Sequence, residues 1–96
     1  IAAIVAGYEA QGRIGACAGK SLYLGGFHPT STSGTFGAAA CAARLLGLGA
    51  HELVNAWGLA LSMASGSMQF SEDPVGTMVK RIHAGLPAQS GILAAQ

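Results

Sequence analysis

Apolar residues recur along most of this chain at the spacing of an α-helix. The first large apolar residues stand at positions i, i+3, i+4 and i+7, which share one face of a helix: Ile1, Ile4, Val5 and Tyr8. Alanines fill the remaining sides. The pattern therefore predicts a first helix, reaching to about Ala16, that is apolar all round and buried in the protein.

Three further helices are predicted downstream. One runs from about Gly34 to Leu46 and ends at Gly47, which can take the left-handed conformation of a helix C-terminus. The next begins near Ala50 and ends at Gly66, and the last starts close to Pro87, since proline suits the first helical position. Small residues on the two middle helices are expected to bring their axes close together: Gly37, Ala40, Gly58 and Ser62.

Two substantial loops separate these helices. The first includes Ser21–Leu24, where a short extended stretch would fit but no sheet is predicted, and the hydroxyl-rich segment 30–33. The second covers Ser67 to Val79 and contains the helix breakers Pro74 and Gly76. The fold class is thus all-α, with about four helices and two long loops.

Composition changes the picture from a free-standing domain to a buried one. Of the 96 residues, 51% are hydrophobic and only 9% are charged, against about 25% charged in ordinary soluble domains. Neither Ile1 at the start nor Gln96 at the end belongs to a capped helix. We therefore expect residues 1–96 to form a single, incomplete domain within a larger helical body.

Several function classes are disfavoured by charge and spacing. The formal net charge is +1 and the basic residues are scattered, so there is no electrostatic footprint for nucleic acid. The longest apolar stretch, Leu53–Phe70, contains Asn55 and Gln69 and is a poor membrane span, which needs about 20 mostly apolar residues. Cys17 and Cys41 lack zinc-site spacing, and no metal site is predicted.

Candidate chemistry lies in the two loops. Pro29 restricts His28 to extended conformations and so fixes its direction. The hydroxyls that follow, including Thr30 and Ser31, are expected to satisfy the first N–H groups of the next helix, whose N-terminus can bind a carboxylate. His28 is therefore a candidate acid/base beside an anion site, although a structural histidine that only caps the loop would fit as well.

The second candidate group follows the second loop. If this segment is helical, Lys80 and His83 share a face, whereas Arg81 points elsewhere. A lysine in a chain with so few charges suits the capture of a substrate carboxylate. The alternative is a solvated basic loop with no ligand.

Read in order, the chain resembles the MmgE/PrpD family along nearly its whole length. The matching segments are Ala6-Gly7-Tyr8-Glu9 with Arg13-Ile14-Gly15, Gly26-Phe27-His28-Pro29-Thr30-Ser31, Gly34-Thr35-Phe36-Gly37-Ala38-Ala39-Ala40, Leu45-Leu46-Gly47-Leu48, Met78-Val79-Lys80-Arg81-Ile82-His83-Ala84-Gly85 and Ala88-Gln89-Ser90-Gly91. The family includes 2-methylcitrate dehydratase, cis-aconitate decarboxylase and iminodisuccinate epimerase. The resemblance implies a large helical domain, of which this chain is a fragment, a smaller α+β domain and a homodimer.

The resemblance also implies roles for individual residues. His28 matches the active-site histidine of the family's Phe-His-Pro motif, and Lys80 matches the lysine of its Lys-Arg-x-His motif. These two are the expected catalytic residues, converging on one pocket, while Thr30, Ser31 and His83 are expected to bind substrate. The other groups of the site would lie outside this chain.

The activity implied by the resemblance is that of a cofactor-independent lyase acting on a small di- or tricarboxylate. The first expectation is a hydro-lyase like 2-methylcitrate dehydratase of propionate catabolism, which eliminates water by acid/base catalysis. A related decarboxylase or epimerase is the alternative, as is a non-catalytic helical scaffold or dimerisation fragment. The expected location is the cytoplasm, or the mitochondrial matrix in a eukaryote.

Overall fold

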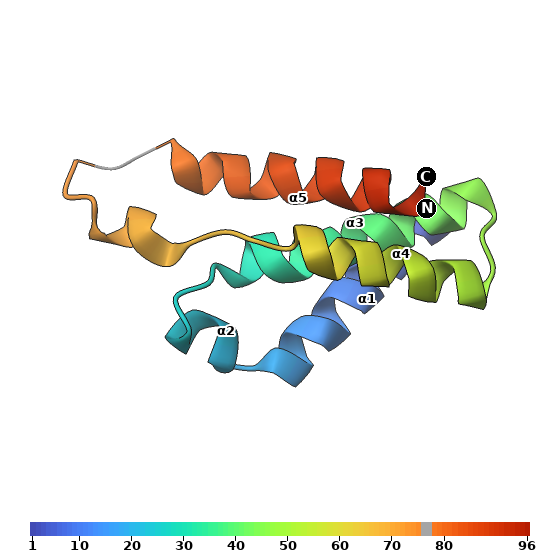
Figure 1. Cartoon of the computed structure of the whole chain (residues 1–96), viewed down its shortest axis with the longest axis horizontal. Helices are drawn as coiled ribbons and strands as arrows, with labels where there is room; N and C mark the ends of the chain where they lie inside the picture. The colour runs from blue at the N-terminus through green and yellow to red at the C-terminus, as the bar shows by residue number, and fades with distance from the viewer. Residues whose placement is uncertain (76–77) are drawn as a thin grey trace.

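The computed structural model describes residues 1–75 and 78–96, which fold into helices (Figure 1). Apart from one isolated bridge, this described part of the chain contains no β-structure, so the all-α prediction is confirmed. The elements are α1 (Ala2–Ala18), α2 (Ser21–Leu24), α3 (Pro29–Leu46), α4 (Ala50–Met63), a 3-10 helix η1 (Met68–Glu72) and α5 (Val79–Ala95).

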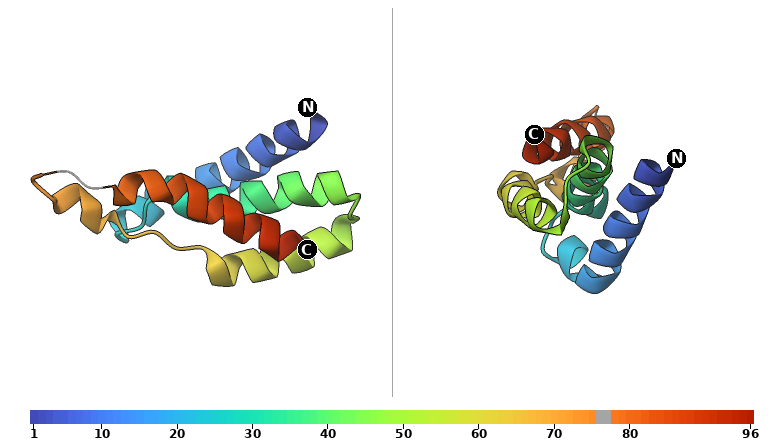
Figure 2. Two further views of the ribbon diagram at one scale, coloured as in Figure 1. Left: turned by 90° about the horizontal axis from the view of Figure 1, so that it is seen from above. Right: turned by 90° about the vertical axis from the view of Figure 1, so that its right-hand side faces the viewer.

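Helix α3 is the centre of the arrangement, because it contacts α1, α4 and α5. Figure 1 shows α3, α4 and α5 side by side along the length of the molecule, and α1 crossing obliquely. The left view in Figure 2 shows α1 diverging from α3 toward the N-terminus. Both chain termini lie at one end, and η1 lies at the other with the start of α5.

Glycines allow the backbones of these helices to touch. Gly7 of α1 meets Gly37 of α3 so closely that a Cβ atom on Gly37 would lie 2.9 Å from the Gly7 carbonyl oxygen. Gly91 of α5 lies against α3, where an added Cβ would be 2.5 Å from the Cβ of Ala38 and 2.6 Å from the nitrogen of Ala39. Helix α3 is therefore held between two glycine contacts.

The expected close approach of α3 and α4 through glycine is wrong. Gly58 faces open space and Ser62 is exposed, while Gly37 lies against α1 and not against α4. Helix α4 instead packs through the buried Ala56 and Ala60. Trp57 of α4 adds a hydrogen bond, since its Nε1–H donates to the Phe36 carbonyl at 3.2 Å.

The first helix forms as predicted but buries the opposite face. The large apolar residues Ile4, Val5 and Tyr8 are 56%, 54% and 73% exposed, so the prediction of an all-round buried helix is wrong for the residues described. Helix α1 packs on α3 through Ala3 and Gly7, because a methyl group at one position and no side chain at the other let the two backbones come together.

Helix α3 begins at Pro29, five residues earlier than predicted. Proline at the first helical position has its φ already set for a helix, which favours this start. The hydroxyls that follow therefore lie inside the helix and do not cap it: Ser33 donates to the Pro29 carbonyl at 2.5 Å, and Thr35 donates to that of Ser31 at 3.1 Å.

Helix α5 also begins earlier than predicted, at Val79, with Pro87 inside it. The proline is buried, and its ring lies 3.7 Å from where a Cβ on Gly34 would stand, so contact with α3 offsets the cost of interrupting the helix. Residues 21–24 form a short helix and not the extended stretch considered above. None of the helices described is long and apolar enough to cross a membrane.

Candidate active site

Two histidines from distant parts of the sequence meet where α3 and α5 begin. His28 is the N-cap residue of α3, and His83 lies in the second turn of α5. Their Nδ1 atoms are 3.1 Å apart, which is hydrogen-bonding distance. The ring of Phe70, from η1, stands edge-on to both, with centroids 5.2 Å from His28 and 5.4 Å from His83.

The backbone of His28 is held by the second loop. Its N–H donates to the Gly66 carbonyl at 2.8 Å, and the N–H of Met68 donates to the Gly26 carbonyl at 2.8 Å. These bonds flank an isolated antiparallel bridge between Phe27 and Ser67. The two loops therefore form one unit, and the direction of His28 is set by the bridge as well as by Pro29.

Gly66 is the tightest point of this unit. Its φ of 120° lies where side chains are strained. A Cβ atom there would also stand 2.5 Å from Ser31 Cβ and 2.6 Å from Ser31 Oγ, with His83 Cε1 only 3.6 Å away. A residue with a side chain would push the second loop away from α3, whereas the distance to His83 on α5 is that of an ordinary contact.

We expect Gly66→Ala to destabilise the protein by about 1–3 kcal/mol through strain alone, with a further loss from the clash with Ser31. The matched control is Gly26→Ala, because Gly26 also has a positive φ of 82° but has nothing within 4 Å of an added Cβ. Thermal unfolding of both variants separates strain from clash. Equal shifts in Tm would contradict the close contact at Gly66.

The pKa of His28 is lowered from its ordinary value of 6.5. Burial is the largest cause, and the positive charges of His83 and Lys80 add to it. The Nδ1–Nδ1 hydrogen bond also needs one nitrogen with a proton and one without. The two rings therefore cannot both be imidazolium ions while this bond is kept.

The expected site residues are only partly brought together. His28, Lys80 and His83 lie at one end of the bundle, where the exposed Lys80 is close enough for its charge to act on His28. Ser31 is buried under Gly66. Thr30 is exposed and lines a different groove. The catalytic and substrate-binding roles of these residues stay predictions.

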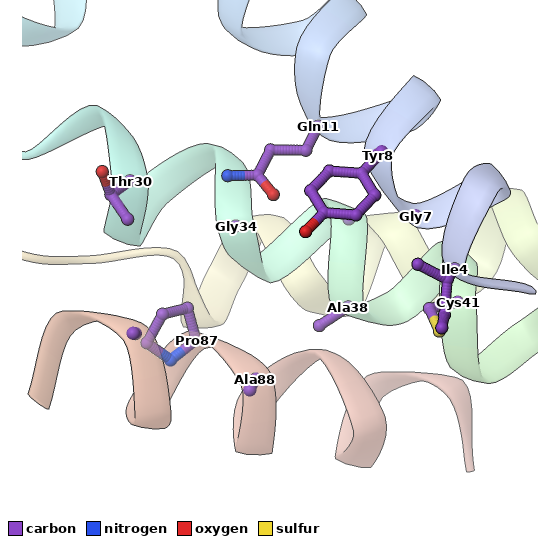
Figure 3. Close-up of a pocket in the computed structure, with 12 residues that line it drawn as sticks. Ile4, Gly7, Tyr8, Gln11, Thr30, Gly34, Ala38, Cys41, Pro87 and Ala88 are labelled. Carbon is purple, nitrogen blue, oxygen red and sulfur yellow. The ribbon is translucent and has the colours of Figure 1, made fainter.

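The groove that Thr30 lines runs between α1, α3 and α5 and has a volume of about 330 Å³ (Figure 3). Tyr8 and Gln11 enter it from α1, and Pro87 from α5. Neither histidine of the pair lines this groove, nor does Lys80. Its walls are mainly small and apolar.

Sequence reasoning did not find Gly66 and Phe70. The sequence pattern predicts Gly66 only as a helix end, which is wrong because α4 ends at Met63, and it predicts Phe70 only as part of an apolar stretch. A glycine between Ser65 and Ser67, four residues before an aromatic residue, carries no specific signal. Their part in the site follows from the bridge that joins the two loops.

Comparison with known proteins agrees with the order of motifs in the chain. The profile of the MmgE/PrpD N-terminal domain matches residues 1–96. The chain belongs to the MmgE/PrpD family. The described helices correspond to the N-terminal helical domain of that family.

Curated relatives of this MmgE/PrpD chain come from Aspergillus. The chain is 35% identical over 94 residues to the cis-aconitate decarboxylase of Aspergillus terreus, covering 97% of this chain and 19% of that protein. It is 33% identical over 96 residues to the cis-aconitate decarboxylase-like protein oryM of Aspergillus oryzae, covering 99% of this chain and 19% of that protein. The chain thus spans about a fifth of the length of these relatives.

Proposed function

We propose that this chain supplies an acid/base histidine and a carboxylate-binding lysine to a cofactor-independent lyase that acts on a small di- or tricarboxylate. The observation that carries the proposal is the His28–His83 pair, 3.1 Å apart, with the charge of Lys80 acting on it. The resemblance of the two motifs to the active-site motifs of the family supports the same roles.

The chemistry needs a proton carrier and a cation at these positions. In this proposal the imidazole of His28 exchanges a proton with the substrate, since a group with a pKa near neutrality can both accept and return one. Lys80 binds a substrate carboxylate and stabilises the negative charge that builds up beside it in the transition state. His28 is neutral over most of the physiological range because its pKa is lowered. A neutral imidazole can accept a proton at one nitrogen and donate one from the other.

Two reactions of this kind are candidates. In decarboxylation a C–C bond breaks, CO₂ leaves, and the electron pair left on carbon takes a proton from an acid. In dehydration a base removes a proton from carbon beside a carboxylate, and an acid protonates the departing hydroxyl, which leaves an alkene. We place decarboxylation of cis-aconitate first, because the relatives of this chain are named as a cis-aconitate decarboxylase and a cis-aconitate decarboxylase-like protein. Dehydration of 2-methylcitrate comes second.

The test is an assay of the intact protein that contains this chain. Purified protein is incubated with cis-aconitate, 2-methylcitrate, citrate and iminodisuccinate. Release of CO₂, formation of an alkene and inversion of configuration at carbon are followed separately. Turnover of at least one of these carboxylates is expected. Absence of turnover of all four, in a folded protein, would favour the alternative of a non-catalytic helical scaffold.

Lys80→Met is expected to weaken the transition-state complex by about 1.5–3 kcal/mol, because a hydrogen bond to a charged group is lost. This corresponds to a fall in kcat/KM of about 10- to 150-fold. Arg81→Met is the matched control, since Arg81 is also an exposed cation of α5 but does not act on the pKa of His28. Equal effects of the two substitutions would mean that Lys80 contributes only general charge.

A further inference from the structure

His83 is an unusual residue for its position. It is only 6% exposed, in the second turn of a helix, and its Nδ1 faces the Nδ1 of His28. A buried polar side chain is costly unless it is hydrogen-bonded. The contact with His28 supplies this hydrogen bond. It also places a second imidazole ring next to Nδ1 of the acid/base candidate.

We propose that His83 is a positioning residue, which engages Nδ1 of His28 so that Nε2 of His28 is the only ring nitrogen left to exchange a proton with a substrate. This differs from the substrate-binding role expected from the motif. It rests on the proposed function in one respect, namely that His28 is the group that transfers protons.

The geometry restricts the protonation states of the pair. If His28 donates its Nδ1 proton to His83, Nε2 of His28 carries a lone pair and can act as a base. If His83 donates, Nε2 of a neutral His28 carries the proton and can act as an acid. When Nε2 of His28 takes a proton from the substrate, the Nδ1 proton can move to His83. His28 is then neutral with its proton on Nε2, ready to act as an acid, and the positive charge lies on His83.

The surroundings of His83 keep its ring from turning away. Phe70 stands edge-on at 5.4 Å, and the backbone of Gly66 closes a second side, with His83 Cε1 3.6 Å from where a Cβ would be. Pro87 has no N–H, so the His83 carbonyl receives no bond from the residue four places later. The imidazole ring of His83 thus lies on α5, and the contact of α5 with α3 is fixed by Pro87.

The direct test is imidazole ¹⁵N NMR of the intact protein labelled in its histidines, with the His28 signals assigned by their loss in His28→Gln. In the unsubstituted protein we expect the Nδ1 proton of the pair to be hydrogen-bonded and protected from exchange. In His83→Phe, which keeps a ring but has no nitrogen, the hydrogen bond and the protection from exchange should be lost, and His28 should populate both tautomers. His51→Phe is the control, because His51 is exposed on α4.

Kinetics give a second readout. His83→Phe should lower kcat by about 10- to 100-fold with little change in KM, by analogy with removal of the partner that orients a metal-bound histidine. His83→Asn, which can still pair with His28 Nδ1, should be about tenfold more active than His83→Phe. Removing His83 also removes one cause of the low pKa of His28, so the acid limb of the pH profile should move to higher pH, with Lys80 still opposing it.

The outcomes separate this inference from the proposed function. An unchanged tautomer in His83→Phe, or kinetics equal to those of the parent, overturns the positioning role even if the protein is an active lyase. A protein that turns over no carboxylate refutes the proposed function, but the NMR signals of His28 still decide whether His83 engages it. If His83→Phe does not fold, the unsubstituted protein and His83→Asn decide: a freely exchanging Nδ1 proton in the parent overturns the inference.

Discussion

Gly91→Ala should destabilise the helical domain more than any other single methyl addition considered above. The added Cβ would overlap backbone atoms of α3, including the carbonyl oxygen of Thr35 and the nitrogen of Ala39 at 2.6 Å. Neither atom can rotate away as the end of a side chain can, so α5 or α3 has to move. We expect a loss above about 3 kcal/mol, the upper end for overpacking in a core.

Gly85→Ala is the matched control for this prediction. Gly85 lies in the same helix but has nothing within 4 Å of an added Cβ. Alanine there should stabilise the helix by about 0.5–1 kcal/mol through its higher helix propensity. Thermal unfolding of the intact protein should therefore shift down for Gly91→Ala and slightly up for Gly85→Ala. Similar Tm values for the two variants would show that α3 and α5 do not meet at Gly91.

His28→Gln should have the largest effect on turnover. Glutamine can keep hydrogen bonds at this position but cannot carry a proton at neutral pH. General acid/base catalysis by one side chain typically contributes 10²- to 10⁴-fold, so we expect kcat to fall within about that range. KM should change little, since binding of the carboxylate is assigned to Lys80.

The pH profile checks the same role. The pKa of His28 lies below its ordinary value of 6.5, so its neutral, basic form persists to lower pH than for an exposed histidine. Where His28 acts as the base, as in dehydration, the acid limb of kcat/KM should therefore lie below pH 6.5 and disappear in His28→Gln. His51→Gln serves as the control with an unchanged profile. A His28→Gln variant with near-normal kcat would remove His28 from the proposed chemistry.

Helical periodicity was enough to predict the fold class, but the helix boundaries depend on packing. Pro29 and Pro87 illustrate this, because both are compatible with a helix start and only one serves as one. Pro87 lies inside α5 since its ring is buried against α3. Periodicity also could not tell which face of α1 meets α3, because glycine and alanine give no hydrophobic signal although they permit the closest approach.

For the site, local sequence indicated the candidates but not their partners. The restriction of His28 by Pro29 could be inferred from adjacent residues. The shared face of Lys80 and His83 followed from helical spacing. The pairing of His28 with His83 could not be derived, since it depends on how the second loop returns over α3 through Gly66. The resemblance to the family named both motifs without indicating this contact.

The bridge between Phe27 and Ser67 also bears on how the protein reaches its folded state. The two residues lie forty positions apart, and α3 and α4 occupy most of the intervening chain. A contact of such sequence separation costs loop-closure entropy that the local turns of a helix do not. We therefore expect α3 and α4 to dock before the bridge closes, so that the histidine pair is assembled late in folding. The bridge should correspondingly be among the first contacts to open in partial unfolding of the native protein.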